Sequence, residues 1–158
     1  MEAWRVNYHG LQARFKKTNF ILYGSVDDIW LNTINNSLIL VDYKSQANFK
    51  PLDPDSYLSD VYHEGYKIQM DFYAYLLSEM GLSVGPTAYF LVCNADRGAD
   101  GFFGKMEFSE TLIPYRWDTG WIPGQVEAMI NTMNSTSIPH SNPSCKNCAY
   151  AKQRSQFQ

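Results

Sequence analysis

The feature that most constrains the fold is an apolar run that ends in opposite charges. Residues 37–41 read Ser-Leu-Ile-Leu-Val, follow a two-asparagine turn signal and lead directly into Asp42, Tyr43 and Lys44. Such a run predicts a buried strand over residues 38–44. Alternate side chains of a strand point to one face about 6–7 Å apart, so Asp42 and Lys44 face the same site and Tyr43 points away. Because unpaired charges are costly to bury, something must pair with them there.

Length and composition bound the class of protein. A chain of 158 residues with 45 % hydrophobic and 18 % charged residues predicts a single globular domain over 1–158. The net charge of −3 argues against a basic surface over the whole chain, though not against a local basic patch. There is no signal-peptide pattern and no apolar run of the roughly 20 residues that a membrane-spanning helix needs. These patterns predict a cytoplasmic protein with no membrane partner.

Alternation and apolar periodicity predict an α/β fold with a mixed central β-sheet flanked by helices. Strands are expected over 11–15, 20–31, 38–44, 87–93 and 102–108, helices over 59–80 and from Pro123 onward, and a loop over 46–59. The first three strands have short links and predict an antiparallel meander, after which strand, helix and strand form a β-α-β unit. Segment 135–158 is expected to be a loop-rich tail.

Three short motifs carry a more specific signal. They are Gly24-Ser-Val-Asp27, Asp42-Tyr43-Lys44 and Gln69-Met-Asp-Phe-Tyr73. In order and spacing they resemble the PD-(D/E)xK nuclease superfamily, and within it the RecB-like branch that includes CRISPR-associated exonucleases. The resemblance implies a restriction-endonuclease-like core. In that core the first two motifs end neighbouring strands, and the third lies on the helix that follows.

The resemblance also implies the chemistry of the site. Asp27, Asp42 and the backbone carbonyl of Tyr43 would bind Mg²⁺ or Mn²⁺, because hard oxygen ligands suit these ions. Such an ion polarises a phosphodiester and lowers the pKa of a bound water. Lys44 would orient that water or offset the charge that builds on the phosphate.

Gln69 and Tyr73 share a helix face, since they lie at i and i+4, and by resemblance that face contacts DNA or positions Lys44. Each motif alone has an ordinary structural explanation: a solvated strand end, an exposed turn or a half-buried helix face. Their joint occurrence in family order favours the nuclease interpretation. The Gly-x-x-Asp spacing favours Asp27 over Asp28, and strand alternation lets only one of the two face the site.

The N-terminus departs from the family pattern. RecB-like nucleases carry a helix before the first strand, and that helix supplies a histidine or a glutamate to the metal. Only residues 1–10 precede the first expected strand here, so either the domain lacks this helix or the sequence is a fragment of a longer protein. Glu2 and His9 are the remaining candidates, and a histidine in such a position is more often a turn or surface residue than a ligand.

The cysteines depart from the pattern as well. Cys145-Lys-Asn-Cys148 resembles the last part of the 4Fe–4S cluster motif of some RecB-like exonucleases, but Arg154 stands where the final cysteine would be. An iron–sulfur cluster therefore cannot be assembled on this chain alone, and Cys93, within an apolar run, is expected to be a buried core thiol. We expect a degenerate remnant of a cluster site, the alternative being Zn²⁺ held with His140 or across a dimer.

Three functions follow for comparison. The leading one is a metal-dependent DNA nuclease, an exonuclease or end-processing enzyme in repair or in defence against foreign DNA. The second is a catalytically impaired nuclease-fold module that binds DNA, a partner protein or a second copy of itself. The acidic composition and the incomplete ligand sets favour this second function. The third is an unrelated domain with coincidental motifs, in which Asp27 would lie far from Asp42.

Overall fold

A computed structural model describes residues 2–6, 9–101 and 103–157 of the chain. The chain divides into two compact units, Met1–Ile122 and Pro123–Gln158. The first unit contains both sheets and the helix between them, and the second consists of helices and extended chain.

The first unit is built on a four-stranded sheet with the order β3-β4-β5-β6. Its strands are β3 (Asp28–Asn32), β4 (Ser37–Asn48), β5 (Thr87–Asp96) and β6 (Phe108–Arg116). β4 pairs antiparallel with β3 and parallel with β5, and β5 pairs antiparallel with β6. The predicted mixed sheet with flanking helices is therefore confirmed, including the β-α-β unit formed by β4, α2 (Glu64–Glu79) and β5.

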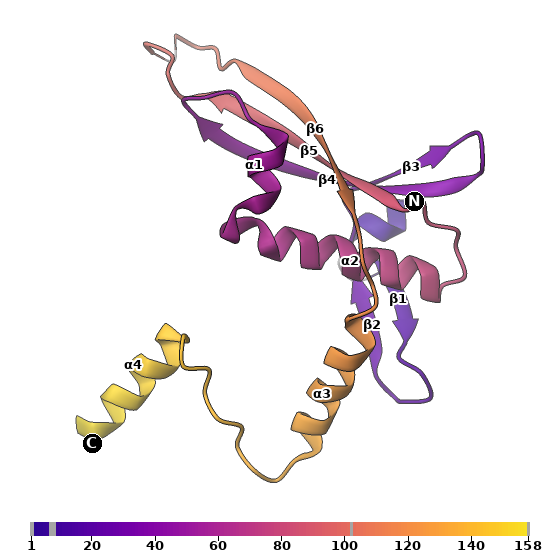
Figure 1. Ribbon diagram of the computed structural model, residues 1–158, viewed down its shortest axis with the longest axis vertical. Helices are drawn as coiled ribbons and strands as arrows, with labels where there is room; N and C mark the ends of the chain where they lie inside the picture. The colour runs from indigo at the N-terminus through magenta and orange to yellow at the C-terminus, as the bar shows by residue number, and fades with distance from the viewer. Residues whose placement is uncertain (1, 7–8, 102, 158) are drawn as a thin grey trace. The chain divides into compact units, whose positions relative to one another are not determined.

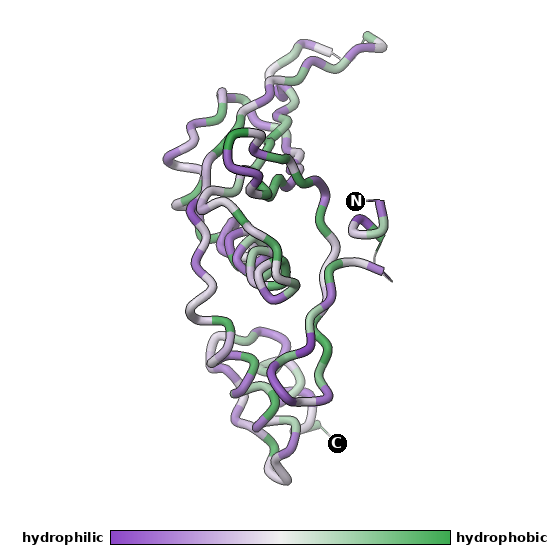
Figure 2. Tube along the Cα trace, turned by 90° about the vertical axis from the view of Figure 1, so that its right-hand side faces the viewer, coloured by the Kyte–Doolittle hydropathy of each residue, from purple (hydrophilic) through white to green (hydrophobic). Residues whose placement is uncertain are grey.

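Helix α2 lies between this sheet and a separate hairpin, made of β1 (Leu11–Arg14) and β2 (Ile21–Gly24), as Figure 1 shows. Green and purple alternate along the turns of α2 in Figure 2, because the helix has apolar and polar positions on different faces. Its apolar residues meet those of the sheet and the hairpin in one core, which includes Leu11, Leu40, Met70, Leu76, Leu77, Phe90, Val92 and Ile113. We call the face of the main sheet that packs against α2 the inner face.

The single strand expected over 20–31 is wrong, because this segment forms two strands in different sheets. β2 ends at Gly24 in the hairpin, and β3 begins at Asp28 in the main sheet. The crossing is held by Val26, which is buried and donates its N–H to the carbonyl of Trp4, in the 3-10 helix η1 (Glu2–Arg5), at 3.1 Å. The expected meander is therefore divided, and Asp27 lies at the corner where the chain changes sheets.

The loop expected over 46–59 is also wrong at both ends. β4 continues to Asn48 because residues 46–48 pair with residues 94–96 of β5. The short helix α1 (Pro54–Ser59) then begins after Asp53, whose carboxylate accepts the N–H of Ser56 at 3.2 Å. An aspartate cap followed by proline is a strong helix start, and in this sequence it overrides the loop signal of the prolines.

The helix expected over 59–80 begins later, at Glu64. Asp60 is extended and its carboxylate accepts the N–H of Tyr62 at 2.9 Å, which starts a separate 3-10 helix, η2 (Val61–His63). The expected end is close to the observed one. Gly81 follows with a φ of +80°, a backbone conformation that glycine adopts at no steric cost.

Two expectations about the far strands need correction. The strand expected over 102–108 lies further along the chain, as β6, and position 102 is outside the described residues. β6 is an edge strand, which tolerates Pro114 because its free side needs no N–H. Cys93 is half-buried rather than a core thiol, since alternation puts Val92 and Asn94 on the inner face of β5 and Cys93 on the other.

The second unit contains α3 (Ile122–Asn134), which continues from the end of the first unit, then α4 (Lys146–Arg154) and a 3-10 turn η3 (Ser155–Phe157). The expected helix from Pro123 is present. The tail has more structure than expected, because Cys145 caps α4 by accepting the N–H of Cys148 on its sulfur at 3.3 Å. No helix in the described part of the chain combines the length and apolar character needed to cross a membrane.

Candidate active site

The charged pair predicted from the sequence lies on the inner face of β4, where the strand passes under α2. Asp42 is only 1 % exposed, and the Lys44 ammonium forms an ion pair with its Oδ2. Tyr43 between them faces the opposite side and is largely exposed. The predicted alternation of side chains along the strand is therefore observed. Because the ion pair is buried, removing either partner would leave the other charge buried without compensation.

Asp27 joins this pair from the corner between the two sheets. Its Oδ2 accepts the backbone N–H of Tyr43 at 2.9 Å, just beyond the last residue of β4 that pairs with β3. Asp28 is turned to the other face, where it accepts hydrogen bonds from Arg5 Nη2 at 2.6 Å and from the Tyr43 hydroxyl at 2.6 Å. Of the two neighbouring aspartates, the structure thus brings Asp27 to the site, whereas Asp28 joins η1 to the sheet.

The two site carboxyls influence each other electrostatically. Burial raises the pKa of Asp42 above its ordinary value of 3.8, the Lys44 hydrogen bond and charge oppose this rise, and the charge and hydrogen bond of Asp27 add to it. Asp28 shows the opposite direction, because hydrogen bonds from Tyr43 and Arg5 outweigh its burial and lower its pKa. Asp42 is therefore a carboxylate that gains from any further positive charge beside it.

Gln69 of α2 connects the members of the site. Its Oε1 accepts a hydrogen bond from Lys44 Nζ at 3.3 Å, and its Nε2 donates to Asp42 Oδ1 at 3.1 Å and to the Tyr73 hydroxyl at 2.9 Å. One amide thus orients both the acid and the base of β4. The helix spacing that places Gln69 and Tyr73 on one face also places both of them over the strand.

Tyr66 is a member of the site that the sequence patterns did not indicate. The Lys44 ammonium lies 4.5 Å from the centre of its ring, within the range of a cation–π contact. The Tyr66 ring stacks on the His63 ring, with 5.1 Å between the ring centres, and the His63 ring stacks on the Tyr57 ring, with 3.9 Å between the centres. Burial, with the charges of Tyr66 and Asp42, raises the pKa of Tyr57 to about 12. Tyr66 occupies the position three before Gln69, so helical spacing from that residue is the signal that could have found it.

A family model described as the PD-(D/E)XK nuclease superfamily matches residues 2–153. The chain belongs to the PD-(D/E)XK nuclease superfamily. Neither curated proteins nor solved structures gave a match. The mixed sheet flanked by helices is consistent with the restriction-endonuclease-like fold of this superfamily.

Nucleases of this superfamily generally use divalent metals such as Mg²⁺, so the donor set of the site can be compared with that need. Oδ2 of Asp42 is buried and faces the Lys44 ammonium, which is the partner that the structure gives it. Tyr43 gives its N–H to Asp27 rather than to β5, and its carbonyl points to the same side of the strand. Two carboxylates and one carbonyl fit Mg²⁺, which usually keeps several waters and binds substrate phosphate as well.

Among the described residues, no third acidic or histidine side chain joins this donor set. His9 is exposed, and its backbone N–H donates to the carbonyl of Val6 at 3.0 Å. Glu2 is likewise exposed. Within residues 2–6, 9–101 and 103–157, no three His, Cys, Asp or Glu side chains are close enough together to hold a metal ion. The candidate donors that remain are the carboxylates of Asp27 and Asp42 and the Tyr43 carbonyl.

Cys145 and Cys148 lie together at the start of α4 as free thiols. Hydrogen bonding from Cys148 lowers the pKa of Cys145, and the same contact raises the pKa of Cys148. His140 is not part of a three-ligand group with them in the described chain. In the described residues, the two thiols therefore lack the further ligands of a complete metal site.

Proposed function

We propose that this chain is a metal-dependent DNA nuclease of RecB-like type, which hydrolyses phosphodiesters at or near DNA ends in repair or in defence against foreign DNA. One observation carries the proposal. A corner, a strand and a helix bring Asp27, Asp42, Lys44 and Gln69 together around one buried carboxylate. Burial and the neighbouring Asp27 both disfavour the charged form of Asp42, and carboxyls perturbed in this way are concentrated at functional sites.

Mg²⁺ or Mn²⁺ bound by Asp27, Asp42 and the Tyr43 carbonyl would polarise the scissile phosphodiester and activate a water. Lys44 would place a positive charge where charge grows on the phosphate, and Gln69 orients its ammonium by accepting a hydrogen bond from it. Asp42 keeps its charge more readily in the metal-bound state, because a cation beside it opposes the effect of burial. Tyr73 holds Gln69 in position through its hydroxyl.

The proposal is tested with the full chain, purified with EDTA and then supplied with Mg²⁺, Mn²⁺ or Ca²⁺. Linear and circular DNA, single- and double-stranded, serve as substrates. We expect cleavage with Mg²⁺ or Mn²⁺ and its loss in Asp42→Ala and Lys44→Ala. Asp55→Ala and Lys105→Ala change exposed residues outside the site and should cleave as the wild type does. Cleavage that survives both site variants would refute the proposal, since the activity would then come from another site or a contaminant.

The second candidate is a nuclease-fold module that binds DNA or a partner protein without turnover. One observation favours it: the described residues contribute two acidic side chains to the donor set and no third His, Cys, Asp or Glu. In this case DNA would bind with the same affinity in each divalent metal and remain intact. Titration of the protein with Mn²⁺ separates the two functions. Only the nuclease is expected to bind Mn²⁺ in a way that depends on Asp27 and Asp42.

A further inference from the structure

A cavity of about 560 Å³ opens beside the candidate active site, along the continuation of β4. Gln46 forms part of its wall, and on the inner face of β4 it is the next residue after Lys44. Alternate residues of a strand are about 6–7 Å apart, so the cavity begins within one such step of the lysine. Its volume falls within the range of about 300–1,000 Å³ that is typical of small-ligand sites.

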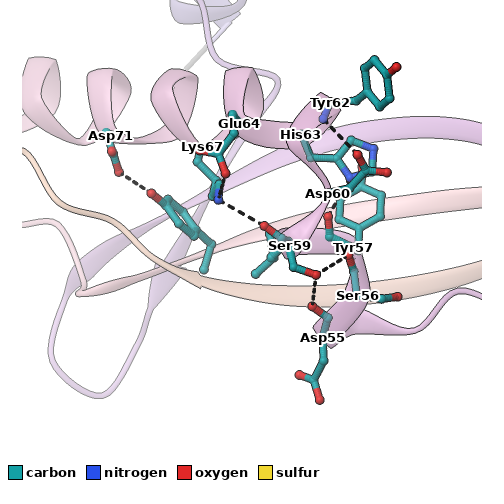
Figure 3. A network of polar contacts seen from close by, with 12 residues as sticks. Asp55, Ser56, Tyr57, Ser59, Asp60, Tyr62, His63, Glu64, Lys67 and Asp71 are labelled. Carbon is teal, nitrogen blue, oxygen red and sulfur yellow. Dashed lines mark hydrogen bonds and ion pairs between the residues drawn. The ribbon is translucent and has the colours of Figure 1, made fainter.

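One wall of the cavity is a stack of aromatic rings that starts at the active site. Lys44 contacts Tyr66, Tyr66 stacks on His63 with an interplanar angle of 16°, and His63 stacks on Tyr57. Figure 3 shows the His63 and Tyr57 rings lying against each other at the junction of α1 and α2. The Nδ1 of His63 lies 2.7 Å from the carbonyl of Tyr57, so this nitrogen carries the hydrogen and fixes the ring. His63 and Tyr57 both line the cavity.

The lining also includes an exposed aromatic ring with cations beside it. Phe49 lines the cavity and is 70 % exposed, and the guanidinium of Arg97 lies 5.1 Å from the centre of its ring. The N–H of Arg97 donates to the carbonyl of Asn48 at 3.2 Å, which ties the arginine to the end of β4. Lys50 also lines the cavity. Exposed aromatic faces combined with cations are how proteins hold the bases and phosphates of single strands.

The rim of the cavity carries carboxylate oxygens that can accept hydrogen bonds. Asp53 uses its Oδ2 to cap α1, and Asp60 uses its Oδ1 to cap η2, so each carboxylate is fixed in place while its second oxygen can accept from a ligand. Exocyclic amino groups of bases are suitable donors to such oxygens. Aromatic faces, cations and fixed acceptors together match a nucleobase with its phosphate better than a purely apolar ligand.

We propose that this cavity is a base-binding subsite, which takes one unpaired nucleobase of the strand whose phosphate lies at Asp42 and Lys44. Phe49 stacks on the base, Asp53 and Asp60 offer acceptors to the N–H groups on its edge, and Arg97 and Lys50 balance the neighbouring phosphates. The subsite rests on the proposed function, because it shares a strand of substrate with the catalytic residues. A base within the cavity cannot be paired, so the nucleotide beside the cleaved phosphate must be single-stranded or flipped out.

The test measures binding without cleavage, in EDTA and again in Ca²⁺. A short single-stranded DNA with 2-aminopurine at successive positions reports stacking through the loss of its fluorescence. We expect quenching with the wild type, binding weaker by about ten-fold with Phe49→Ala, and recovery with Phe49→Trp, which restores a stacking face. Phe103→Ala removes an even more exposed phenylalanine that does not line this cavity, and should bind as the wild type does.

The outcomes separate this subsite from the nuclease proposal. Weaker DNA binding by Phe49→Ala and recovery of binding by Phe49→Trp support the subsite. They support it even if no metal ion gives cleavage. The lack of cleavage would refute only the nuclease activity. Equal binding by the wild type and Phe49→Ala overturns the subsite, while cleavage that depends on Asp42 and Lys44 would still stand. A wild type that binds no single-stranded DNA in either buffer, or that binds a fully paired duplex more tightly, also overturns it.

Discussion

Gly24 and Tyr73 are packed so closely that no side chain fits between them. A Cβ atom on Gly24 would lie 2.8 Å from Cε1 and 3.2 Å from Cδ1 of the tyrosine ring. Gly24 is the last residue of β2, and Tyr73 lies one turn beyond Gln69 on α2. The glycine of the Gly-x-x-Asp motif therefore has a steric purpose: it lets the ring that supports Gln69 pass the hairpin.

Gly24→Ala should lower the cleavage rate while the chain remains folded. The new methyl group displaces Tyr73, whose hydroxyl then no longer meets Gln69, and the amide loses its position over Asp42 and Lys44. We expect initial rates on the same DNA to fall by about 10- to 100-fold, as small misplacements of catalytic groups do. Gly65→Ala is the matched control, because no atom lies within 4 Å of its Cβ position. Wild-type rates for Gly24→Ala would contradict this account.

The raised pKa of Asp42 predicts how stability depends on pH. A carboxyl whose pKa is higher in the folded than in the unfolded state contributes most below 3.8, and this contribution is lost as pH rises through the folded-state pKa. Asp42→Asn lacks the titration. In EDTA, the free energy of unfolding of the variant minus that of the wild type should therefore increase over this pH window and then level off.

Lys44→Met provides an internal check on the same measurement. The Lys44 hydrogen bond and charge lower the pKa of Asp42, so their removal should move the transition to higher pH. Urea unfolding monitored by circular dichroism across the pH range gives both curves. A transition that moves to lower pH in Lys44→Met, or a pH-independent difference between Asp42→Asn and the wild type, would show that Asp42 is not the titrating group.

The parts of the site that could be predicted from the sequence are those set by local geometry. Asp42 and Lys44 share a face because strands alternate, and Gln69 and Tyr73 share a face because helices repeat every 3.6 residues. Neither relationship depends on distant contacts. The burial of Asp42 also followed from the apolar run before it, since residues 37–41 supply the centre of the sheet.

The parts that escaped prediction depend on contacts between distant segments. The change of sheet between β2 and β3 is set by packing of the hairpin against α2 and by the Val26–Trp4 hydrogen bond, which no local pattern announces. The extension of β4 to Asn48 depends on residues 94–96, nearly fifty positions away. Tyr66 belongs to the site only because Lys44 reaches its ring across the gap between strand and helix. Long-range pairing of this kind overrides local propensity.

Tyr66 should act as a positioning residue for Lys44. Its ring lies 4.5 Å from the ammonium, a contact that contributes about 0.5–2 kcal/mol. Tyr66→Phe keeps the ring and should cleave within about two-fold of the wild type. Tyr66→Leu keeps comparable bulk without the ring face, and its rate should fall by about ten-fold. The pH–rate profile distinguishes positioning from loss of stability, because only a displaced Lys44 changes the apparent pKa values. Equal rates for the phenylalanine and leucine variants would refute the role of the ring.

Asp71 should matter for stability and little for cleavage, although it lies between Gln69 and Tyr73 in sequence. It is buried on the opposite side of α2, where it accepts hydrogen bonds from the Tyr115 hydroxyl, the Asp118 N–H and Trp121 Nε1, each at 2.9 Å. Asp71→Ala leaves three partly buried hydrogen bonds without their acceptor, and should lower the free energy of unfolding by about 2–4 kcal/mol.

Tyr115→Phe is the graded comparison for that variant, because it removes one donor and leaves Asp71 with the other two. It should cost about 1 kcal/mol in urea unfolding, well below the loss in Asp71→Ala. Both variants, assayed below their unfolding midpoints, should cleave DNA at close to the wild-type rate, since Gln69 and Tyr73 keep their own contacts with the site. A cleavage defect in Asp71→Ala as large as that of Gly24→Ala would mean that the two faces of α2 are coupled, and that the buried carboxylate helps to place Gln69.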